Sequence, residues 1–479
     1  MRSRLLRRAA VAPRAMAAPL AVATVMGMCA SISAPAALAQ EDGPPVASEG
    51  PILGGPPQPP TPTERTAECA VPEFSGDATQ TPSPSRILDL DRAWDLATGR
   101  GQKVAVIDTG VTPHPRLGPV QPGGDYVSDG DGLQDCDGHG TIVAGLIAAA
   151  PSDDDGFAGV APDAEILSIR QSSLAFGPAE RGPLPEYQQV GDGYGTVSTL
   201  AAAVVRAVDL GATVINISQV ACAPSAAELD DDMLGRSLRF AHDRGVVVVV
   251  AAGNLQGNGP CDAQNPIADP ARPNGPAWDT VTTHVSPARW SDQVLTVGAV
   301  DARGAAMPFS IRGPWLGVAA PGIDIVSLDP TPGATGLVNR QLTAEGLSPF
   351  AGSSFSTAYV SGLAALLRER FPDAGPDEIT DRIRATAHAP QSGHDEQIGA
   401  GVIDPVAALT DSTVPESGVG SVAFVEPTPP PEPDPLPRIL AFSGAGLLLV
   451  LAGGGWAIAL AVRREPRPEV TVDAVDDSY

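Results

Sequence analysis

The sequence predicts an α/β fold in which a mainly parallel β-sheet is covered by helices on both faces, with one C-terminal transmembrane helix. Two observations predict it. Between residues 87 and 410, short apolar runs alternate with alanine-rich segments. Near the C-terminus, residues 439–462 contain no charged side chain. A chain of 479 residues with this pattern is expected to hold one large domain with appendages.

Five apolar runs are candidates for strands. They are continuous rather than alternating with polar residues, and they cover residues 103–107, 165–169, 214–217, 246–250 and 294–297. Continuous hydrophobicity is typical of strands that are buried on both faces. Residues 141–150 and 199–210 are rich in alanine and long enough for helices. This alternation predicts a parallel sheet between two layers of helices, whose ligands bind at the carboxyl ends of the strands.

The first 39 residues have the order of a secretory signal peptide. Five arginines between Arg2 and Arg14 precede an apolar run, and Ala37-Leu38-Ala39 offers a cleavage site of small residues. An uncleaved N-terminal anchor is the alternative. Residues 40–86 follow as an N-terminal extension, which is rich in proline and glycine and is not expected to pack a core of its own.

The C-terminal region predicts a membrane anchor. As a helix, residues 439–462 would rise about 36 Å, which is enough to cross a hydrocarbon core of about 30 Å. The proline-rich residues 411–438 form a linker ahead of this helix, and arginines follow it, so the positive-inside rule places the tail of residues 463–479 in the cytoplasm. The domain at residues 87–410 is then extracytoplasmic. A buried core helix is the alternative, which the glycines at 453–455 disfavour.

Charge and cysteine content narrow the function. The 56 acidic residues outnumber the 30 basic ones, which disfavours nucleic acid as a partner. Cys29 lies in the predicted signal peptide, so an even number of cysteines remains outside the cell: Cys69, Cys136, Cys222 and Cys261. They predict two disulfides among three possible pairings. No pair has the spacing of a zinc site, and no metal or other cofactor is expected.

Three polar residues stand where predicted strands end or helices begin. Asp108 directly follows the run 103–107, His139 lies between two glycines ahead of an apolar helix, and Ser354 begins another helical segment. A serine hydroxyl becomes a strong nucleophile when an imidazole accepts its proton, and a buried carboxylate fixes and stabilises that imidazole. Singly, these residues could be a strand cap, a turn and a helix N-cap. In the order Asp, His, Ser they follow the chain order of the subtilisin triad.

Residues 104–110, 137–145 and 352–356 resemble the three signature segments of the subtilisin-like serine proteases. The resemblance extends from about residue 87 to residue 409. It implies a subtilisin-like fold and a serine endopeptidase with Asp108, His139 and Ser354 as its catalytic triad. It also implies a side-chain oxyanion donor, Asn254, and a substrate cleft lined by Ser218, Gln219, Val220 and Gly253.

Two positions depart from the family pattern beside the nucleophile. Ser353 stands where threonine is common, and Ala358 stands where the family has proline four residues after the nucleophile. Both replacements are conservative in shape. The missing proline bears on where the helix starts, and therefore on the direction of Ser354.

The order of segments resembles that of the mycosins, the proteases of type VII (ESX) secretion systems. This resemblance implies that the extension wraps around the domain and that Cys69 pairs with Cys136. If the strands before Ser218 and Asn254 are neighbours, the other two cysteines leave the sheet at the same edge and can also pair. That bridge would stabilise the loops beside the cleft by a few kcal/mol.

The mycosin resemblance implies functions of two classes. One is proteolysis of secreted protein or peptide substrates, which the intact triad and Asn254 favour. The other is a structural part in the secretion membrane complex, which the anchor, the linker and the irregular stretch 171–196 favour. An inactive adhesion module would require the triad to be accidental. Cleavage specificity depends on loops that a sequence does not position.

Overall fold

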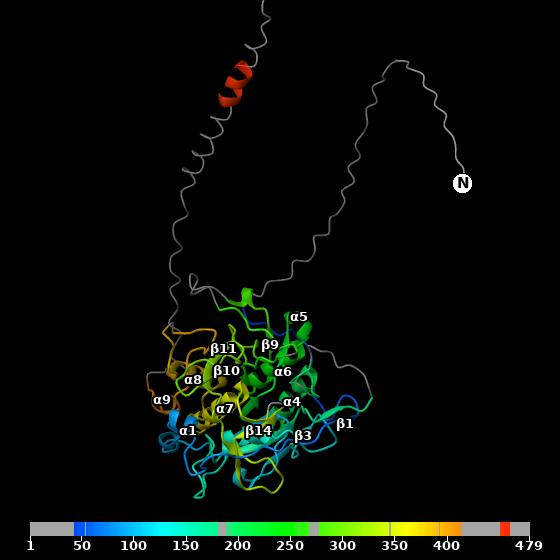
Figure 1. Cartoon of the computed structure of the whole chain (residues 1–479), viewed down its shortest axis with the longest axis vertical. Coiled ribbons are helices and arrows are strands. Elements are labelled where there is room, and N and C mark those ends of the chain that lie inside the picture. The colour runs from blue at the N-terminus through cyan, green and yellow to red at the C-terminus, as the bar shows by residue number, and fades with distance from the viewer. Residues whose placement is uncertain are drawn as a thin grey trace, which may run out of the picture. The chain divides into compact units, whose positions relative to one another are not determined.

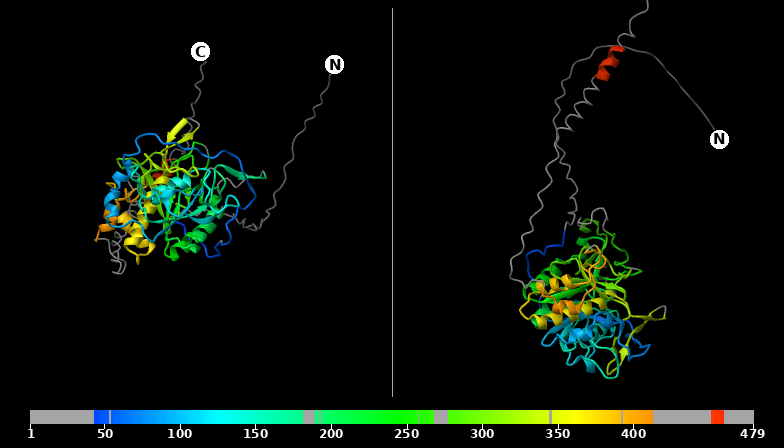
Figure 2. Two further views of the ribbon diagram at one scale, coloured as in Figure 1. Left: turned by 90° about the horizontal axis from the view of Figure 1, so that it is seen from below. Right: turned by 90° about the vertical axis from the view of Figure 1, so that its left-hand side faces the viewer.

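A computed structural model describes residues 43–412, apart from residues 53, 181–188, 192, 258, 268–276, 344–345 and 392, together with residues 451–459. The chain divides into a first unit of residues 1–418 and a second unit of residues 419–479. Figure 1 labels some of the elements of the first unit, and Figure 2 gives two further views.

A seven-stranded sheet forms the centre of the first unit, with the strand order β11-β10-β8-β6-β2-β4-β3. All six neighbouring pairs are parallel. The strands are β2 (Lys103–Asp108), β3 (Gln121–Asp125), β4 (Glu165–Arg170), β6 (Val214–Ile217), β8 (Val247–Ala251), β10 (Leu295–Val300) and β11 (Leu316–Pro321). All five runs predicted as strands lie in this sheet, and the prediction of a mainly parallel sheet is confirmed.

Helices cover both faces of this sheet, as predicted. Val104 and Val106 of β2 belong to the core that contains apolar side chains of α3, α7 and α8, whereas Ala105 and Ile107 belong to the core that contains those of α4 and α6. Successive strand residues therefore enter opposite cores, which explains the continuous hydrophobicity of the runs. The helices are α3 (His139–Ala148), α4 (Val197–Asp209), α6 (Asp232–Asp243), α7 (Ser353–Arg370) and α8 (Pro376–Thr386). Figure 1 shows α7 and α8 on one side of the unit and α4 and α6 on the other.

The two outermost strands were not predicted. β3 reads Gln-Pro-Gly-Gly-Asp, and its pairing with β4 shifts register between Pro122 and Gly124. A proline is tolerated there because β3 lies at the edge of the sheet, where one side of the strand needs no ladder partner. Composition alone therefore hides this strand.

Shorter elements connect and flank these layers. Antiparallel pairs join β1 to β5, β7 to β9, β12 to β13 and β14 to β15. The β14–β15 hairpin projects from the first unit in the left view of Figure 2. These elements are β1 (Thr63–Arg65), α1 (Ser83–Ile87), α2 (Leu90–Trp94), η1 (Pro115–Leu117), β5 (Phe176–Pro178), β7 (Ala221–Ala223), α5 (Ala226–Leu229), η3 (Ala277–Thr280), β9 (His284–Ser286), β12 (Ser327–Leu328), β13 (Leu337–Val338), β14 (Arg340–Thr343), β15 (Gly346–Pro349) and α9 (Pro405–Thr410).

The N-terminal extension contacts several parts of the domain. Its Ser48 N–H donates to Asp232 of α6 at 2.8 Å, its strand β1 pairs with β5, and Glu73 exchanges backbone hydrogen bonds with Arg340 of β14. This course agrees with an extension that wraps around the domain. The extension also contains regular structure, because α1 begins at Ser83, where Pro84 favours a first helical turn.

Both predicted disulfides are present. Cys69 is bonded to Cys136, and Cys222 to Cys261. The predicted signal peptide, the tail and nearly all of the linker lie outside the described residues. Of the predicted membrane helix, residues 451–459 are described, and they are helical. Among the described helices, none has the length and hydropathy that a membrane crossing requires.

Candidate active site

The structure brings Asp108, His139 and Ser354 together at the carboxyl edge of the sheet. His139 Nδ1 lies 2.7 Å from Asp108 Oδ1, and His139 Nε2 lies 2.9 Å from Ser354 Oγ. Asp108 ends β2, whereas His139 and Ser354 lie in the first turns of α3 and α7. Asp108 is completely buried and Ser354 is 4% exposed. An imidazole held between a buried carboxylate and a hydroxyl can remove the proton of that hydroxyl.

A second carboxylate, Asp135, fixes the start of the helix that carries His139. The residue before this helix is Gly138, which has no side chain to cap it and has a φ of 77°. Asp135 instead accepts from the backbone N–H groups of Gly138 and Thr141, each at 2.8 Å, and from the hydroxyls of Thr109 and Thr141. Because Thr109 follows Asp108, this one side chain links the end of β2 to the start of α3. The sequence signal was an aspartate four residues before His139, ahead of a glycine that cannot cap.

These carboxylates control the protonation of His139. Burial disfavours its charged form, but the nearby charges of Asp108, Asp135 and Asp137 outweigh burial and raise the pKa of His139 above its usual value of about 6.5. Burial also raises the pKa of Asp135 to about 6, in opposition to the hydrogen bonds from Thr141 and Thr109. The pKa of His139 is therefore raised by the carboxylates around it, whereas that of Asp135 is raised mainly by its own burial.

The helix that carries Ser354 starts in a position that directs this side chain toward His139, even though Ala358 stands where proline was expected. The helix begins at Ser353, whose N–H donates to Asn254 Oδ1 at 2.9 Å and whose hydroxyl donates to the Gly253 carbonyl at 3.1 Å. The first of these bonds orients the side-chain amide of Asn254, because the amide oxygen, and not the NH2 group, accepts the hydrogen bond from Ser353. Within the described residues, the NH2 group of Asn254 has no recorded acceptor, and it lies near Ser354 Oγ.

A cavity of about 280 Å³ lies over these residues, and the predicted cleft residues Ser218, Gln219, Val220 and Gly253 line it together with Asn254. The cavity is also lined by residues that were not predicted, namely Thr109, Asp137, Ser172, Ser173, Leu174, Val190, Gly191, Gly193, Gln256, Gln341, Ala351 and Phe355. Their contribution depends on how loops from several parts of the chain approach one another, which motifs do not reveal.

Hydrogen bonds hold two walls of this cleft. Asp137 accepts from the backbone N–H of Leu174 at 2.8 Å and from the Ser173 hydroxyl at 2.5 Å, so the loop after β4 is tied to the residue two positions before His139. On the other wall, the buried Asn216 of β6 donates to Ser218 Oγ at 2.8 Å. The disulfides reinforce the same loops: Cys136 lies between Asp135 and Asp137, and the Cys222–Cys261 bridge joins the loops after Ser218 and Asn254.

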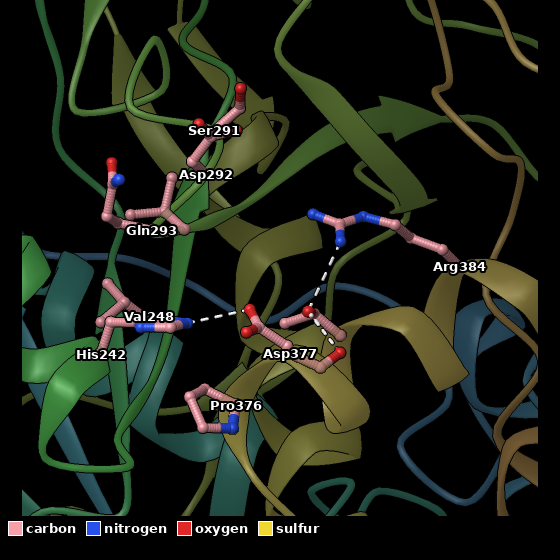
Figure 3. Close-up of a pocket in the computed structure, with 10 residues that line it drawn as sticks. His242, Val248, Ser291, Asp292, Gln293, Pro376, Asp377 and Arg384 are labelled. Carbon is pink, nitrogen blue, oxygen red and sulfur yellow. Dashed lines mark hydrogen bonds and ion pairs between the residues drawn. The ribbon is translucent and has the colours of Figure 1, made fainter. Parts of the chain in front are cut away.

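A second pocket contains another histidine–aspartate pair (Figure 3). His242 Nε2 lies 2.8 Å from Asp377 Oδ1 in a cavity of about 240 Å³ that Ser291 and Arg384 also line. Ser291 is drawn away from the His242 ring in Figure 3, and in the described part of the chain no hydrogen bond joins the two. Among the described residues that line this pocket, no serine is hydrogen-bonded to a base.

Comparisons with known proteins agree with the geometry. The model of the Subtilase family matches residues 99–401. Mycosin-4 of Mycobacterium tuberculosis is 46% identical over 373 residues, which cover 76% of this chain and 77% of that protein. Mycosin-1 of Mycolicibacterium smegmatis is 44% identical over 398 residues, which cover 82% of this chain and 86% of that protein.

Solved structures lead to the same family. The crystal structure of MycP1 from the ESX-1 type VII secretion system is 44% identical with a TM-score of 0.71, covering 77% of this chain and 95% of that one. A chain in the structure of the periplasmic assembly from the ESX-5 inner membrane complex is 43% identical with a TM-score of 0.71, covering 81% of this chain and 99% of that one. This chain therefore belongs to the subtilase family of serine proteases and, within that family, to the mycosins.

Proposed function

We propose that this chain is a membrane-anchored, extracytoplasmic serine endopeptidase that processes substrates of a type VII secretion system with the triad Asp108, His139 and Ser354. The observation that carries the proposal is the hydrogen-bonded series from the buried Asp108 through His139 to Ser354, which opens onto a cleft. Neither the order of residues along the chain nor the family alone would provide this geometry.

The geometry supports acyl transfer in two halves. Ser354 Oγ forms a bond to the carbonyl carbon of the substrate, its proton passes to His139 Nε2, and the carbonyl oxygen takes the displaced electron pair. Asp108 stabilises the resulting imidazolium. The proton then passes to the leaving nitrogen as the carbon–nitrogen bond breaks, and water releases the acyl group from Ser354 by the same steps.

Two hydrogen-bond donors are assigned to the oxyanion, which is the substrate carbonyl oxygen after it has taken the electron pair. They are the side-chain NH2 of Asn254 and the backbone N–H of Ser354, at the N-terminus of α7, whose dipole also favours a negative charge. The hydrogen bond from Ser353 to Asn254 Oδ1 supports this assignment, since it turns the NH2 group away from that contact. Ser218, Gln219 and Gly253 are assigned to substrate binding because they line the same cleft.

Residues 87–410 are proposed to be the protease domain, which a signal peptide at 1–39 exports and a membrane helix at 439–462 anchors. The extension at 40–86 and the linker at 411–438 flank the domain, and the tail at 463–479 is cytoplasmic. The helical conformation of residues 451–459 and the lack of charge across 439–462 support the anchor. The proposed partners are secreted protein or peptide substrates and the secretion membrane complex.

A second function, stabilisation of that complex, is favoured by one observation. The similar chain in the periplasmic assembly from the ESX-5 inner membrane complex is matched over 99% of its length, so this chain has the same domain. A domain of that kind can support an assembly without cleaving anything. The two functions are separable, because Ser354→Ala removes one hydroxyl from a 4% exposed position and leaves the surface unchanged.

The test incubates the full-length chain in detergent with a library of peptides and identifies the products by mass spectrometry. We expect internal cleavages that are absent with Ser354→Ala. A cell that lacks the chain, complemented with Ser354→Ala, should assemble the secretion complex without processing its substrates if both functions hold. Products that persist in the variant would overturn the proposed protease mechanism.

A further inference from the structure

The residue after the nucleophile, Phe355, packs against the catalytic imidazole. The ring centroids of Phe355 and His139 lie 5.3 Å apart, with their planes inclined at 39°. Phe355 is 4% exposed, and its ring also contacts Phe350 at a centroid distance of 5.9 Å. In the described part of the chain, Phe355 provides the one aromatic ring recorded against His139. Phe355 is the third residue of α7, so its backbone belongs to the first turn of that helix.

This contact changes in strength during the reaction. A cation within about 6 Å of an aromatic ring is attracted by the negative face of the ring, whereas a neutral group gains much less. His139 is neutral before the attack of Ser354 and positively charged once it has taken the proton. The ring of Phe355 therefore interacts more strongly with the transition state than with the ground state, and an interaction of that kind accelerates a reaction.

We propose that Phe355 is a positioning residue for His139. The ring of Phe355 holds the imidazole between Asp108 and Ser354 and stabilises the imidazolium that forms as Ser354 attacks. The proposal rests on the proposed function, since it requires this triad to be catalytic. The Phe355 side chain thereby does more than fill space beside the nucleophile.

The other charged groups around His139 are known, so the contribution of the ring can be separated from theirs. Asp108 faces His139 from the end of β2, and Asp135 and Asp137 face it from the segment before α3. The first turn of α7 carries no charged residue, because Ser353 to Ala358 are all neutral. A substitution at position 355 leaves these three carboxylates in place.

The test measures the rate constant for fluorophosphonate inactivation of the full-length chain as a function of pH. For Phe355→Leu, which keeps an apolar side chain but loses the ring, we expect a two- to fivefold slower rate at the plateau. We also expect the acidic midpoint to fall by about half a pH unit, because the imidazolium is less stable. Phe355→Tyr keeps the ring and should restore both values.

The matched control is Phe350→Leu, which removes a ring that contacts Phe355 but not His139. It should lower the melting temperature and leave the midpoint unchanged. The proposal would be overturned if Phe355→Leu had the same midpoint as the wild type. It would also be overturned if the midpoint of Phe350→Leu shifted as much as that of Phe355→Leu, since either result would mean that the Phe355 ring contributes only packing. If Phe355→Leu does not fold, ring-fluorinated phenylalanine at position 355 keeps the shape and weakens the negative face. A midpoint that does not fall with increasing fluorination would also overturn the proposal.

The outcomes separate this proposal from the one on which it rests. A wild-type chain that the probe does not label at any pH overturns the proposed function, and the role of Phe355 with it. A labelled wild type whose midpoint is the same as that of Phe355→Leu overturns the role of Phe355 alone.

Discussion

Two of the histidine–aspartate pairs among the described residues have nearly equal distances but different surroundings. His139 and Asp108 are joined at 2.7 Å, and His242 and Asp377 at 2.8 Å. The Asp108 side chain is 0% exposed, whereas that of Asp377 is 75% exposed. The second imidazole nitrogen of His139 meets Ser354, whereas that of His242 lies 3.9 Å from another carboxylate, Asp243.

The comparison shows that burial and a third partner distinguish the proposed catalytic site from an exposed hydrogen-bonded pair. His242 lies in the last turn of α6 and Asp377 in the first turn of α8, positions where helix dipoles favour a positive and a negative charge respectively. The pair thus joins two helix ends (Figure 3). Asp108, by contrast, lies where water does not screen its charge, so its effect on His139 is strong.

The largest expected effect separates the two serines that lie in these pockets. Ser354→Ala should reduce turnover of a peptide substrate by about 10⁶-fold, because the nucleophile is lost. Ser291→Ala, the matched change in the second pocket, should leave turnover unchanged. Steady-state kinetics on both variants would check this. A Ser354→Ala variant that retained a tenth of the activity would remove the difference between the pockets.

A smaller effect concerns Asn254, the proposed oxyanion donor of the first pocket. Asn254→Ala should lower kcat by about 100- to 1000-fold with little change in KM, because the donor acts on charge that develops in the transition state. Comparison of kcat and KM with those of the wild type tests this. If KM rose while kcat stayed constant, Asn254 would be a substrate-binding residue and not an oxyanion donor.

The pH dependence of activity should reflect the carboxylates around His139. Their charges raise its pKa above the usual value of about 6.5, and the general base must be neutral to act. The value of kcat/KM should therefore rise with pH through a midpoint above 6.5 and fall about tenfold for each pH unit below it. Asp137→Asn removes one carboxylate and should move the midpoint to lower pH; a shift to higher pH would contradict the account.

The smallest effect is expected at the exposed pair. His242→Ala should change the free energy of unfolding by about 0–1 kcal/mol, as is typical of exposed ion pairs, and leave kcat/KM unchanged. Urea denaturation and the same kinetic assay measure the two quantities. Loss of activity in this variant, without loss of stability, would mean that the second pocket communicates with the cleft.

The sequence predicted the parts of the molecule that depend on local pattern. The runs that became β2, β4, β6, β8 and β10 were recognisable because a strand buried on both faces is apolar at every position. The resemblance to subtilases supplied the three residues that the structure brings together, and also Asn254. Residues whose roles depend on the folded structure were not predicted. Asp135 caps a helix that begins four residues later, and Phe355 contacts His139 across a separation of more than 200 residues. The His242–Asp377 pair is likewise 135 residues apart in sequence, so no local pattern indicates it.

The most direct test of the central claim is fluorophosphonate labelling of the full-length chain, followed by identification of the modified peptide. The probe reacts with a serine that a neighbouring base and an oxyanion hole activate. The account predicts labelling of the wild type at Ser354, equal labelling of His242→Ala, and no labelling of Ser354→Ala or His139→Ala. Absence of labelling in the wild type, or labelling that survives in Ser354→Ala, would contradict the claim that Asp108, His139 and Ser354 form the catalytic site.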